Sequence, residues 1–206
     1  MERWREKLKD YIRITAQIIS YLVITPQVRI LFGAKRVFPE DWHSLKCGIL
    51  FVSNHQSKID PFVVLSYLPF RLFLQLLPIH FPVNQRDYQR YYFKPLLKLV
   101  GGYDIGGTKK EKLLGLMRTR HLLKNHKTVF LFPEGEINRE TMGEFQPGIE
   151  FLARDSQGVV FVRMRGFGHY RDVLARGKAL LKFSKVYDID MLPSNAEELK
   201  TFVEQL

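Results

Sequence analysis

The stretch G-I-L-F-V-S-N-H-Q-S-K-I-D-P, residues 48–61, decides the fold of this 206-residue chain. It begins with an apolar run typical of a buried strand and continues as a polar segment that ends in Asp60 and Pro61. Because Pro is favoured at the first helical position behind an Asp N-cap, we expect a helix to begin here. In one continuous helix, His55 and Asp60 would point about 140° apart. With His55 in a loop and Asp60 at the helix start, their side chains can meet.

A second polar segment, F-P-E-G-E-I-N-R at residues 132–139, follows another apolar run at residues 128–131. Its Gly135 lets the backbone approach a ligand closely, and backbone N–H groups at such a turn, with Arg139 nearby, suit a phosphate or a developing oxyanion. In an α/β protein, polar segments at the ends of core strands are where a site forms. We therefore expect a general base, His55 oriented by a carboxylate, to lie near this turn.

The composition sets the class of protein and of partner. Hydrophobic residues make up 46% of the chain, enough for one domain with a sizeable core. The net charge of +11 indicates a negatively charged partner: nucleic acid, anionic lipid headgroups or a phosphorylated substrate. The single cysteine, Cys47, excludes a disulfide framework and a cysteine-rich metal site, and its apolar neighbours predict a buried side chain. The cytoplasm, the reducing side of a membrane, fits this composition best.

Short apolar runs alternate with helical stretches, the pattern of an α/β fold in which helices flank a mixed β-sheet. Strands are predicted at residues 48–53, 71–76, 128–132, 159–165 and 178–184. Helices are predicted at residues 61–68, 87–100, 109–125, 147–156 and 194–205. Thr108 is the expected N-cap of the helix at 109–125.

Residues 1–36 are expected to form a helical segment on a membrane surface, ahead of a single domain at residues 37–206. Aromatic, aliphatic and basic residues are mixed there, as in an interfacial helix or, with Pro26 as the break, a helical hairpin. The uncharged part, residues 14–28, is too short and too polar to span a bilayer, which takes roughly 17–25 apolar residues. The alternative is an ordinary amphipathic helix that packs on the domain.

The two polar segments together resemble the glycerolipid acyltransferase superfamily, whose best-known members are the 1-acylglycerol-3-phosphate acyltransferases. Its N-H-x-S-x-x-D block is matched by Asn54, His55, Ser57 and Asp60, and the start of its F-P-E-G block by residues 132–135. The resemblance implies transfer of a fatty acyl group from a thioester of coenzyme A or acyl carrier protein to a hydroxyl of a lysolipid or related glycerolipid acceptor. His55 would deprotonate the acceptor and Asp60 would support the imidazolium, with no metal or cofactor.

We further predict that five residues of these motifs bind substrate: Asn54, Ser57, Glu134, Gly135 and Arg139. The single cysteine and the N-terminal segment together predict a peripheral or monotopic protein at the cytoplasmic face of a membrane. An anionic lipid surface would then be a partner, as the positive net charge indicates.

The chain departs from the family at several positions, two of which are associated with phosphate binding. The arginine of the F-P-E-G block is replaced by Ile137, and the second block, around Gly106 and Gly107, has no arginine. The valine-proline of the fourth block is Val162-Arg163. These changes favour a zwitterionic, amino-acid-based or sugar-based hydroxyl acceptor over lysophosphatidate.

Two alternatives use the same residues. One is a non-catalytic basic module that binds anionic lipid or nucleic acid, with His55 in a structural role. The other is a hydrolase or lipid transacylase on the same scaffold, which passes the acyl group to water or between phospholipids. We do not expect nucleic acid as a partner, because most aromatic residues lie in apolar stretches without a stacking signature.

Overall fold

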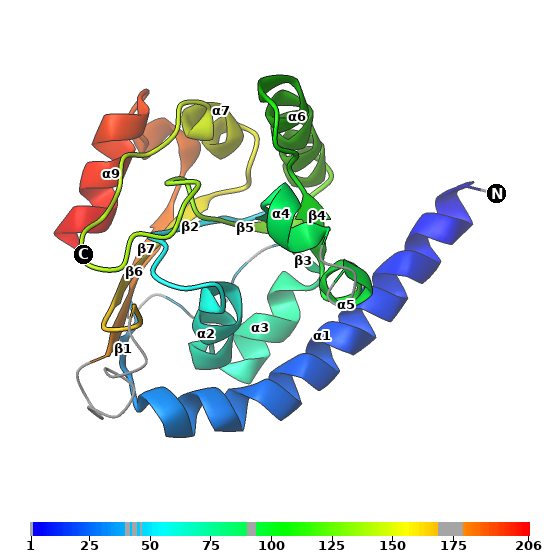
Figure 1. Cartoon of the computed structure of the whole chain (residues 1–206), viewed down its shortest axis with the longest axis horizontal. Helices are drawn as coiled ribbons and strands as arrows, with labels where there is room; N and C mark the ends of the chain where they lie inside the picture. Colours follow the sequence, from blue (N-terminus) through cyan, green and yellow to red (C-terminus); the bar gives the residue numbers. More distant parts are fainter. Residues whose placement is uncertain (1, 40–41, 43–44, 46, 90–93, 169–178) are drawn as a thin grey trace.

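The centre of the structure is a seven-stranded sheet in the order β1-β7-β6-β2-β5-β3-β4 (Figure 1). The structure is a computed structural model that describes residues 2–39, 42, 45, 47–89, 94–168 and 179–206. All neighbouring strands run parallel except β6 and β7, which are antiparallel, so the predicted mixed sheet is confirmed. The strands are β1 (Lys35–Val37), β2 (Leu50–Ser53), β3 (Ile79–Val83), β4 (Gly102–Asp104), β5 (Thr128–Leu131), β6 (Val159–Arg165) and β7 (Leu180–Tyr187).

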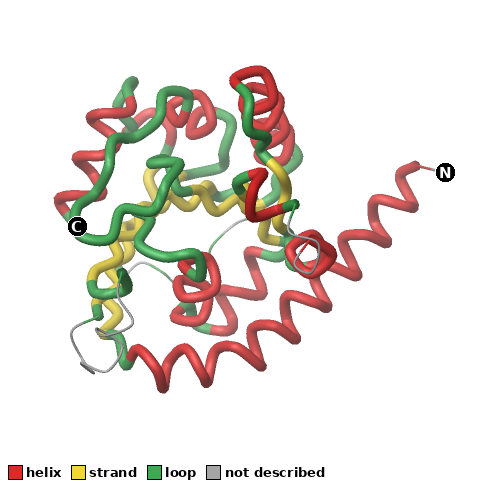
Figure 2. Tube along the Cα trace, viewed as in Figure 1, coloured by secondary structure: helices red, strands yellow, loops and turns green. Residues whose placement is uncertain are grey.

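Helices cover both faces of this sheet (Figures 1 and 2). One face packs against α1 (Glu2–Phe32), α2 (Asp60–Tyr67) and α3 (Phe70–Leu76). The other packs against α6 (Lys109–Lys124), α7 (Ile149–Arg154) and α9 (Ala196–Gln205). The short elements are α4 (Gln85–Tyr88), α5 (Lys94–Leu99) and the 3-10 helix η1 (Ile189–Met191).

Strand β2 shows how the sequence builds these layers. Phe51 belongs to the core cluster on the side of α1, α2 and α3, whereas Leu50 and Val52 belong to the cluster on the side of α6, α7 and α9. Because successive side chains of a strand point to opposite faces, a strand covered on both sides is an unbroken apolar run. Strand β2 pairs in parallel with β5, so the two polar segments that follow these strands emerge at the same edge.

Helix α1 is continuous and is bonded to the rest of the protein along its length. The Gln17 amide bonds the backbone of β3 and of Val100, the residue that directly follows α5. The Tyr21 hydroxyl and the Arg29 guanidinium donate to carbonyls at the C-terminal end of α2. Pro26 lies inside this helix, so the predicted alternative of a hairpin broken there is wrong. Pro removes one backbone hydrogen bond, and the contacts on both sides of it keep the helix in one piece.

Much of the surface of α1 that points away from the protein is apolar, with most of the exposed charges near its N-terminus. The apolar side chains of this surface are at least 43% exposed: Trp4, Leu8, Tyr11, Ile12, Ile19, Leu22, Val23, Ile30 and Leu31. We call these residues the outward face of α1. Residues Trp4–Phe32 are also long and apolar enough to cross a bilayer, a test that a core helix or a signal sequence can pass as well. That the segment does not span a membrane therefore stays a prediction.

Most predicted elements near the centre of the chain are confirmed, and the exceptions have physical reasons. Residues 71–76, predicted as a strand, belong to α3, because the buried Leu72, Phe73 and Leu76 have the spacing of one helix face. Strands β1, β3 and β4 were not predicted, because they have only three to five residues. A Pro within β3 and a Gly within β4 also obscure the apolar pattern of these two strands. The capping box of Thr108 and Glu111 confirms the predicted start of α6.

Three further predictions need comment. The helix predicted at residues 87–100 is two short helices, α4 and α5, and residues 90–93 between them lie outside the described residues. Residues 178–184 were predicted as the last strand; β7 begins at Leu180, and residue 178 also lies outside the described residues. Cys47 is exposed, so its predicted burial is wrong: it lies in a turn that precedes β2, where its thiol donates to the carbonyl of Gln75.

His80, on β3, is a buried histidine outside the predicted site. His80 is only 6% exposed, and its Nε2 has no hydrogen-bond partner among the described residues. The pKa of His80 is lowered to about 3, first by burial and then by the positive charges of Arg13, Lys127 and Arg118. The negative charge of Asp10 opposes this shift. The folded protein therefore holds a neutral imidazole, whereas the unfolded chain protonates it below about pH 6.5.

We expect the substitution His80→Leu to reduce the acid sensitivity of folding. Because the folded pKa is depressed, the stabilisation by neutral His80 is complete above about pH 6.5 and is lost as the pH falls towards 3, by about 2 kcal/mol at pH 5. Urea unfolding at pH 7 and pH 5 measures this loss, which should be smaller by that amount in His80→Leu. The exposed His121 on α6 provides the control, since His121→Leu should keep the wild-type pH dependence. Equal losses in the two variants would contradict the prediction.

Candidate active site

The side chains of His55 and Asp60 are in contact at the carboxyl edge of the sheet. Nδ1 of His55 lies 2.9 Å from Oδ2 of Asp60; the Asp60 side chain is fully buried, and 18% of the His55 side chain is exposed. His55 lies in the loop between β2 and α2, as predicted. Its ring stacks on that of Phe132, with 4.2 Å between the ring centroids. The imidazole is thus held at one nitrogen by a carboxylate and on one face by an aromatic ring.

The carboxylate of Asp60 is held by donors of its own loop. Besides the contact with His55, its Oδ2 accepts backbone N–H groups from Gln56 at 2.6 Å and Ser57 at 2.8 Å, and Oδ1 accepts the Ser57 hydroxyl. Because an ionised carboxylate only accepts, Nδ1 of His55 carries the hydrogen in their bond and Nε2 has the free lone pair. The arrangement is that of a general base with its orienting carboxylate.

The predicted role of Asp60 as the N-cap of α2 is wrong. Asp60 is the first residue of this helix, and Ile59 precedes it without a side-chain cap. The N–H groups of the preceding loop bind the Asp60 carboxylate instead, so it turns back towards His55. Pro61 does occupy the first turn, as predicted.

Glu134 joins the two motifs. Its Oε1 accepts the backbone N–H of His55 at 2.7 Å, and its Oε2 accepts Nδ2 of Asn138 at 2.7 Å and the N–H of Gly143 at 2.8 Å. The backbone N–H of Asn138 in turn donates to the carbonyl of His55 at 2.7 Å. The segment at residues 132–139 therefore bonds both the N–H and the carbonyl of the residue that carries the imidazole.

Two other predicted substrate-binding residues also bond within the protein. The Asn54 side chain accepts the N–H of Met164 at 2.7 Å and donates to its carbonyl at 3.0 Å, which ties the start of the motif to the end of β6. The Ser57 hydroxyl is bonded to Asp60. Like Glu134, both hold the site together in this structure, and their contact with substrate stays a prediction.

Gly135 forms the turn after β5 with φ of +72°, in the left-handed region where a side chain is strained. Its N–H donates to the carbonyl of Phe132 at 3.2 Å, so this group is not free to bind an oxyanion. Glycine is thus required here by the backbone conformation, and the predicted role in substrate binding stays untested.

A pocket of about 530 Å³ opens beside His55. Its walls are the two neighbours of His55, the loop at residues 139–142 and the end of β6 with the turn that follows. The charged side chains in these walls are Arg139, Arg163, Arg165 and Glu140. Arg139 is therefore near the site, as predicted. Arg163 is marked in the sequence only as a replacement of proline, and Arg165 was not predicted as a site residue.

Sequence reasoning also missed Gln56, which connects three parts of the site. Its Oε1 accepts the N–H of Phe167 after β6 at 3.1 Å, and its Nε2 donates to the carbonyl of Arg139 at 3.1 Å. Asn138 was missed as well, although it bonds both Glu134 and the backbone of His55. No sequence signal marks either residue, because the family block leaves the position of Gln56 open and the F-P-E-G match ends before Asn138.

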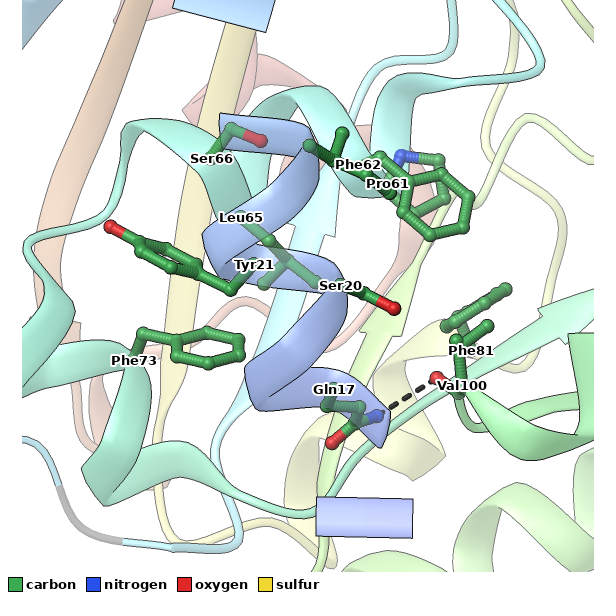
Figure 3. Close-up of a pocket in the computed structure, with 11 residues that line it drawn as sticks. Gln17, Ser20, Tyr21, Pro61, Phe62, Leu65, Ser66, Phe73, Phe81 and Val100 are labelled. Atoms are coloured by element: carbon green, nitrogen blue, oxygen red, sulfur yellow. Dashed lines mark hydrogen bonds between the residues drawn. The ribbon is translucent and has the colours of Figure 1, made fainter. Parts of the chain in front are cut away.

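An apolar seam lies between α1 and α2 and begins at Pro61, directly after Asp60 (Figure 3). Side chains from both helices line it, with Phe81 and Val100 at one end (Figure 3). Its volume is about 30 Å³, the space of about one water molecule. In the described part of the chain, no group of three or more His, Cys, Asp or Glu side chains could hold a metal ion.

Comparison with known proteins identifies the fold and the family of the chain. No curated protein gives a significant match. The crystal structure of the 1-acyl-sn-glycerophosphate (LPA) acyltransferase PlsC from Thermotoga maritima is similar over 98% of this chain and 79% of that one, with a TM-score of 0.59 and 20% identity, which shows a shared fold. The family model described as Acyltransferase matches residues 30–164, well over half of the chain. Because this match spans both polar segments and the strands that bring them together, the chain belongs to the Acyltransferase family.

Proposed function

We propose that the chain transfers a fatty acyl group from an acyl thioester to a hydroxyl of a glycerolipid acceptor, with His55 as the general base. The observation that carries this proposal is the 2.9 Å contact between His55 and the buried Asp60, which leaves Nε2 of His55 as the basic nitrogen. Membership of the Acyltransferase family supports acyl transfer. The similar fold of an enzyme that acts on 1-acyl-sn-glycerophosphate supports a glycerolipid acceptor.

In this reaction, Nε2 of His55 takes the proton of the acceptor hydroxyl while the hydroxyl oxygen attacks the thioester carbonyl. Asp60 stabilises the imidazolium that forms. The tetrahedral intermediate then expels the thiolate, which receives the proton from His55, so that an ester and a free thiol result. Direct attack fits the motif, because its own hydroxyl, that of Ser57, is bonded to Asp60.

The seam between α1 and α2 is the proposed site of the acyl chain. It is apolar, and its lining includes Pro61, the residue that follows Asp60 in the sequence (Figure 3). Because its present volume of about 30 Å³ is too small for a fatty chain, the seam must widen when the chain binds.

Helix α1 supports a location on a membrane surface. Its inner side packs into the core and is bonded to the domain through Gln17, Tyr21 and Arg29, yet its outward face also carries aliphatic and aromatic side chains, unlike a helix whose outer side meets only water. The bonds along its inner side keep α1 against the domain, so its outward face can enter the interface while the helix lies on the bilayer. A net charge of +11 favours an anionic, cytoplasmic leaflet.

We expect the double substitution Leu22→Glu/Val23→Glu to abolish binding to anionic vesicles. These two side chains are 58% and 57% exposed on the outward face of α1. Losing their burial in lipid is expected to weaken partitioning at least roughly tenfold each. Vesicle sedimentation measures the bound fraction.

The matched control is Leu113→Glu/Leu114→Glu on α6, where two leucines are 59% and 61% exposed on the opposite side of the sheet. It adds the same two charges, and it should keep most of the binding. Loss of binding in the α6 variant but not in the α1 variant would place the membrane on the other side of the protein.

The proposed reaction is tested with a labelled long-chain acyl thioester and a panel of lysolipids that includes lysophosphatidate and zwitterionic lysolipids. Labelled two-chain lipid formed only with thioester and acceptor present is the expected product. Labelled free fatty acid as the only product would indicate a hydrolase. Transfer between phospholipids without thioester would indicate a transacylase. Vesicle binding without consumption of the thioester would favour the non-catalytic module.

A further inference from the structure

The end of β6 carries two arginines that the proposed reaction does not use. Arg163 and Arg165 are two positions apart in the strand and thus point to the same side of the sheet, while Val162 and Met164 point to the core on the other side. Both arginines line the pocket of about 530 Å³ beside His55. The neighbouring positions of β6 carry apolar side chains, as expected for a strand in the core. The two arginines depart from this apolar pattern, and such a departure needs a physical reason.

The guanidinium of Arg163 lies in an electrostatically unfavourable position. The pKa of Arg163 is lowered, first by burial and then by the positive charge of Arg165, while Glu204 opposes this effect. Arg163 donates to the backbone carbonyl of Glu204, which is a neutral acceptor. Arg139 adds a third positive charge to the pocket walls, against the single carboxylate of Glu140. An anion in this pocket would relieve the repulsion.

We propose that this pocket binds a phosphate group of a substrate through Arg139, Arg163 and Arg165. A guanidinium presents a planar pair of N–H donors that matches phosphate oxygens. The proposal rests on the proposed function, because it places the phosphate on the acceptor or on the acyl donor of that reaction.

The connection between the pocket and the base supports this assignment. Asn54 and Gln56, on either side of His55 in sequence, form part of the pocket wall. The Gln56 side chain also bonds the carbonyl of Arg139 and the N–H of Phe167, so it fixes the Arg139 loop and the turn after β6 relative to the base. A molecule that places its phosphate here can therefore place a reacting group near His55.

The pocket also accounts for the departures of this chain from its family. The F-P-E-G block has Ile137 where the family has an arginine, and β6 has Arg163 where the family has a proline. The positive charge that is missing from the F-P-E-G block is present on β6, at the same edge of the sheet. An acceptor that carries phosphate, disfavoured by the sequence motifs alone, is thus compatible with the structure.

Two substrates carry suitable groups: a lysolipid with a phosphomonoester and coenzyme A with its phosphates. Calorimetry with glycerol 3-phosphate and with coenzyme A distinguishes them. The measurements use the full chain with His55→Ala as the parent, so that binding is read without turnover and remains informative even if the proposed reaction is wrong. Arg139→Gln, Arg163→Gln and Arg165→Gln are added one at a time, with circular dichroism to verify folding.

Each of these substitutions should weaken binding of one probe roughly tenfold or more, since a charge-assisted hydrogen bond is lost. Arg154→Gln, which removes an equal charge from the exposed end of α7, is the matched control and should leave the dissociation constants unchanged. Weaker binding of glycerol 3-phosphate alone assigns the pocket to the acceptor, and weaker binding of coenzyme A alone assigns it to the donor. The proposal is overturned if the parent binds neither probe, or if the three variants bind both probes as the Arg154 control does.

Discussion

Replacement of His55 by alanine is expected to lower kcat for acyl transfer by roughly 10²–10⁴-fold, the usual contribution of a general base. The fold should survive, because the Asp60 carboxylate keeps the N–H groups of Gln56 and Ser57 and the Ser57 hydroxyl as donors when the imidazole is gone. One hydrogen bond and the stacking on Phe132 are lost, so we expect the free energy of unfolding to fall by about 1–2 kcal/mol. Initial rates of thiol release, together with urea unfolding, measure both quantities.

The control for this experiment is His121→Ala, since His121 is an exposed histidine on α6. It should retain wild-type turnover, which separates loss of the base from loss of any imidazole. If His55→Ala is folded and still releases thiol and forms ester at the full rate, His55 is not the base. The contact with Asp60 would then serve only the structure of the loop.

The local order of residues made the centre of the site predictable. His55 and Asp60 were expected to meet because an apolar run, a short polar loop and a Pro at a helix start leave few other arrangements. The parallel pairing of β2 and β5 then brought the second polar segment to the same edge, as strand ends in such sheets do. Both inferences depended on residues close in sequence or on a general rule of sheet topology.

Contacts between distant residues could not be predicted in this way. The bond from Gln56 to Phe167 joins residues 111 positions apart, and the pairing of Asn54 with Met164 joins residues 110 apart. Arg163 and Arg165 are likewise brought to the site only because β6 pairs with β2. A motif read along one segment shows which chemistry is present but not which parts of the chain surround it. The edge strands β1 and β4 were not predicted for a related reason: three residues are too few to show an alternation of apolar and polar side chains.

Replacement of Glu134 by glutamine is expected to have the second large effect, on both stability and turnover. The carboxylate accepts one N–H group at Oε1 and two at Oε2. A glutamine has only one oxygen, and the orientation that keeps two bonds turns its NH₂ group towards the N–H of His55, so that two donors face each other. We expect the free energy of unfolding to fall by about 2–3 kcal/mol. Because the base is displaced, we expect kcat to fall roughly 100-fold.

Glu136→Gln is the matched control for stability, since Glu136 is exposed two residues further on, and its unfolding should match the wild type. A second comparison separates positioning of the base from simple loss of structure. If Glu134 acts by fixing His55, kcat should fall in Glu134→Gln at temperatures where the protein is fully folded, while KM for the acyl thioester changes little. Glu134→Asp, which keeps an acceptor for the N–H groups, should recover part of kcat. Equal kcat in wild type and Glu134→Gln would mean that the bond from His55 to Glu134 does not position the base.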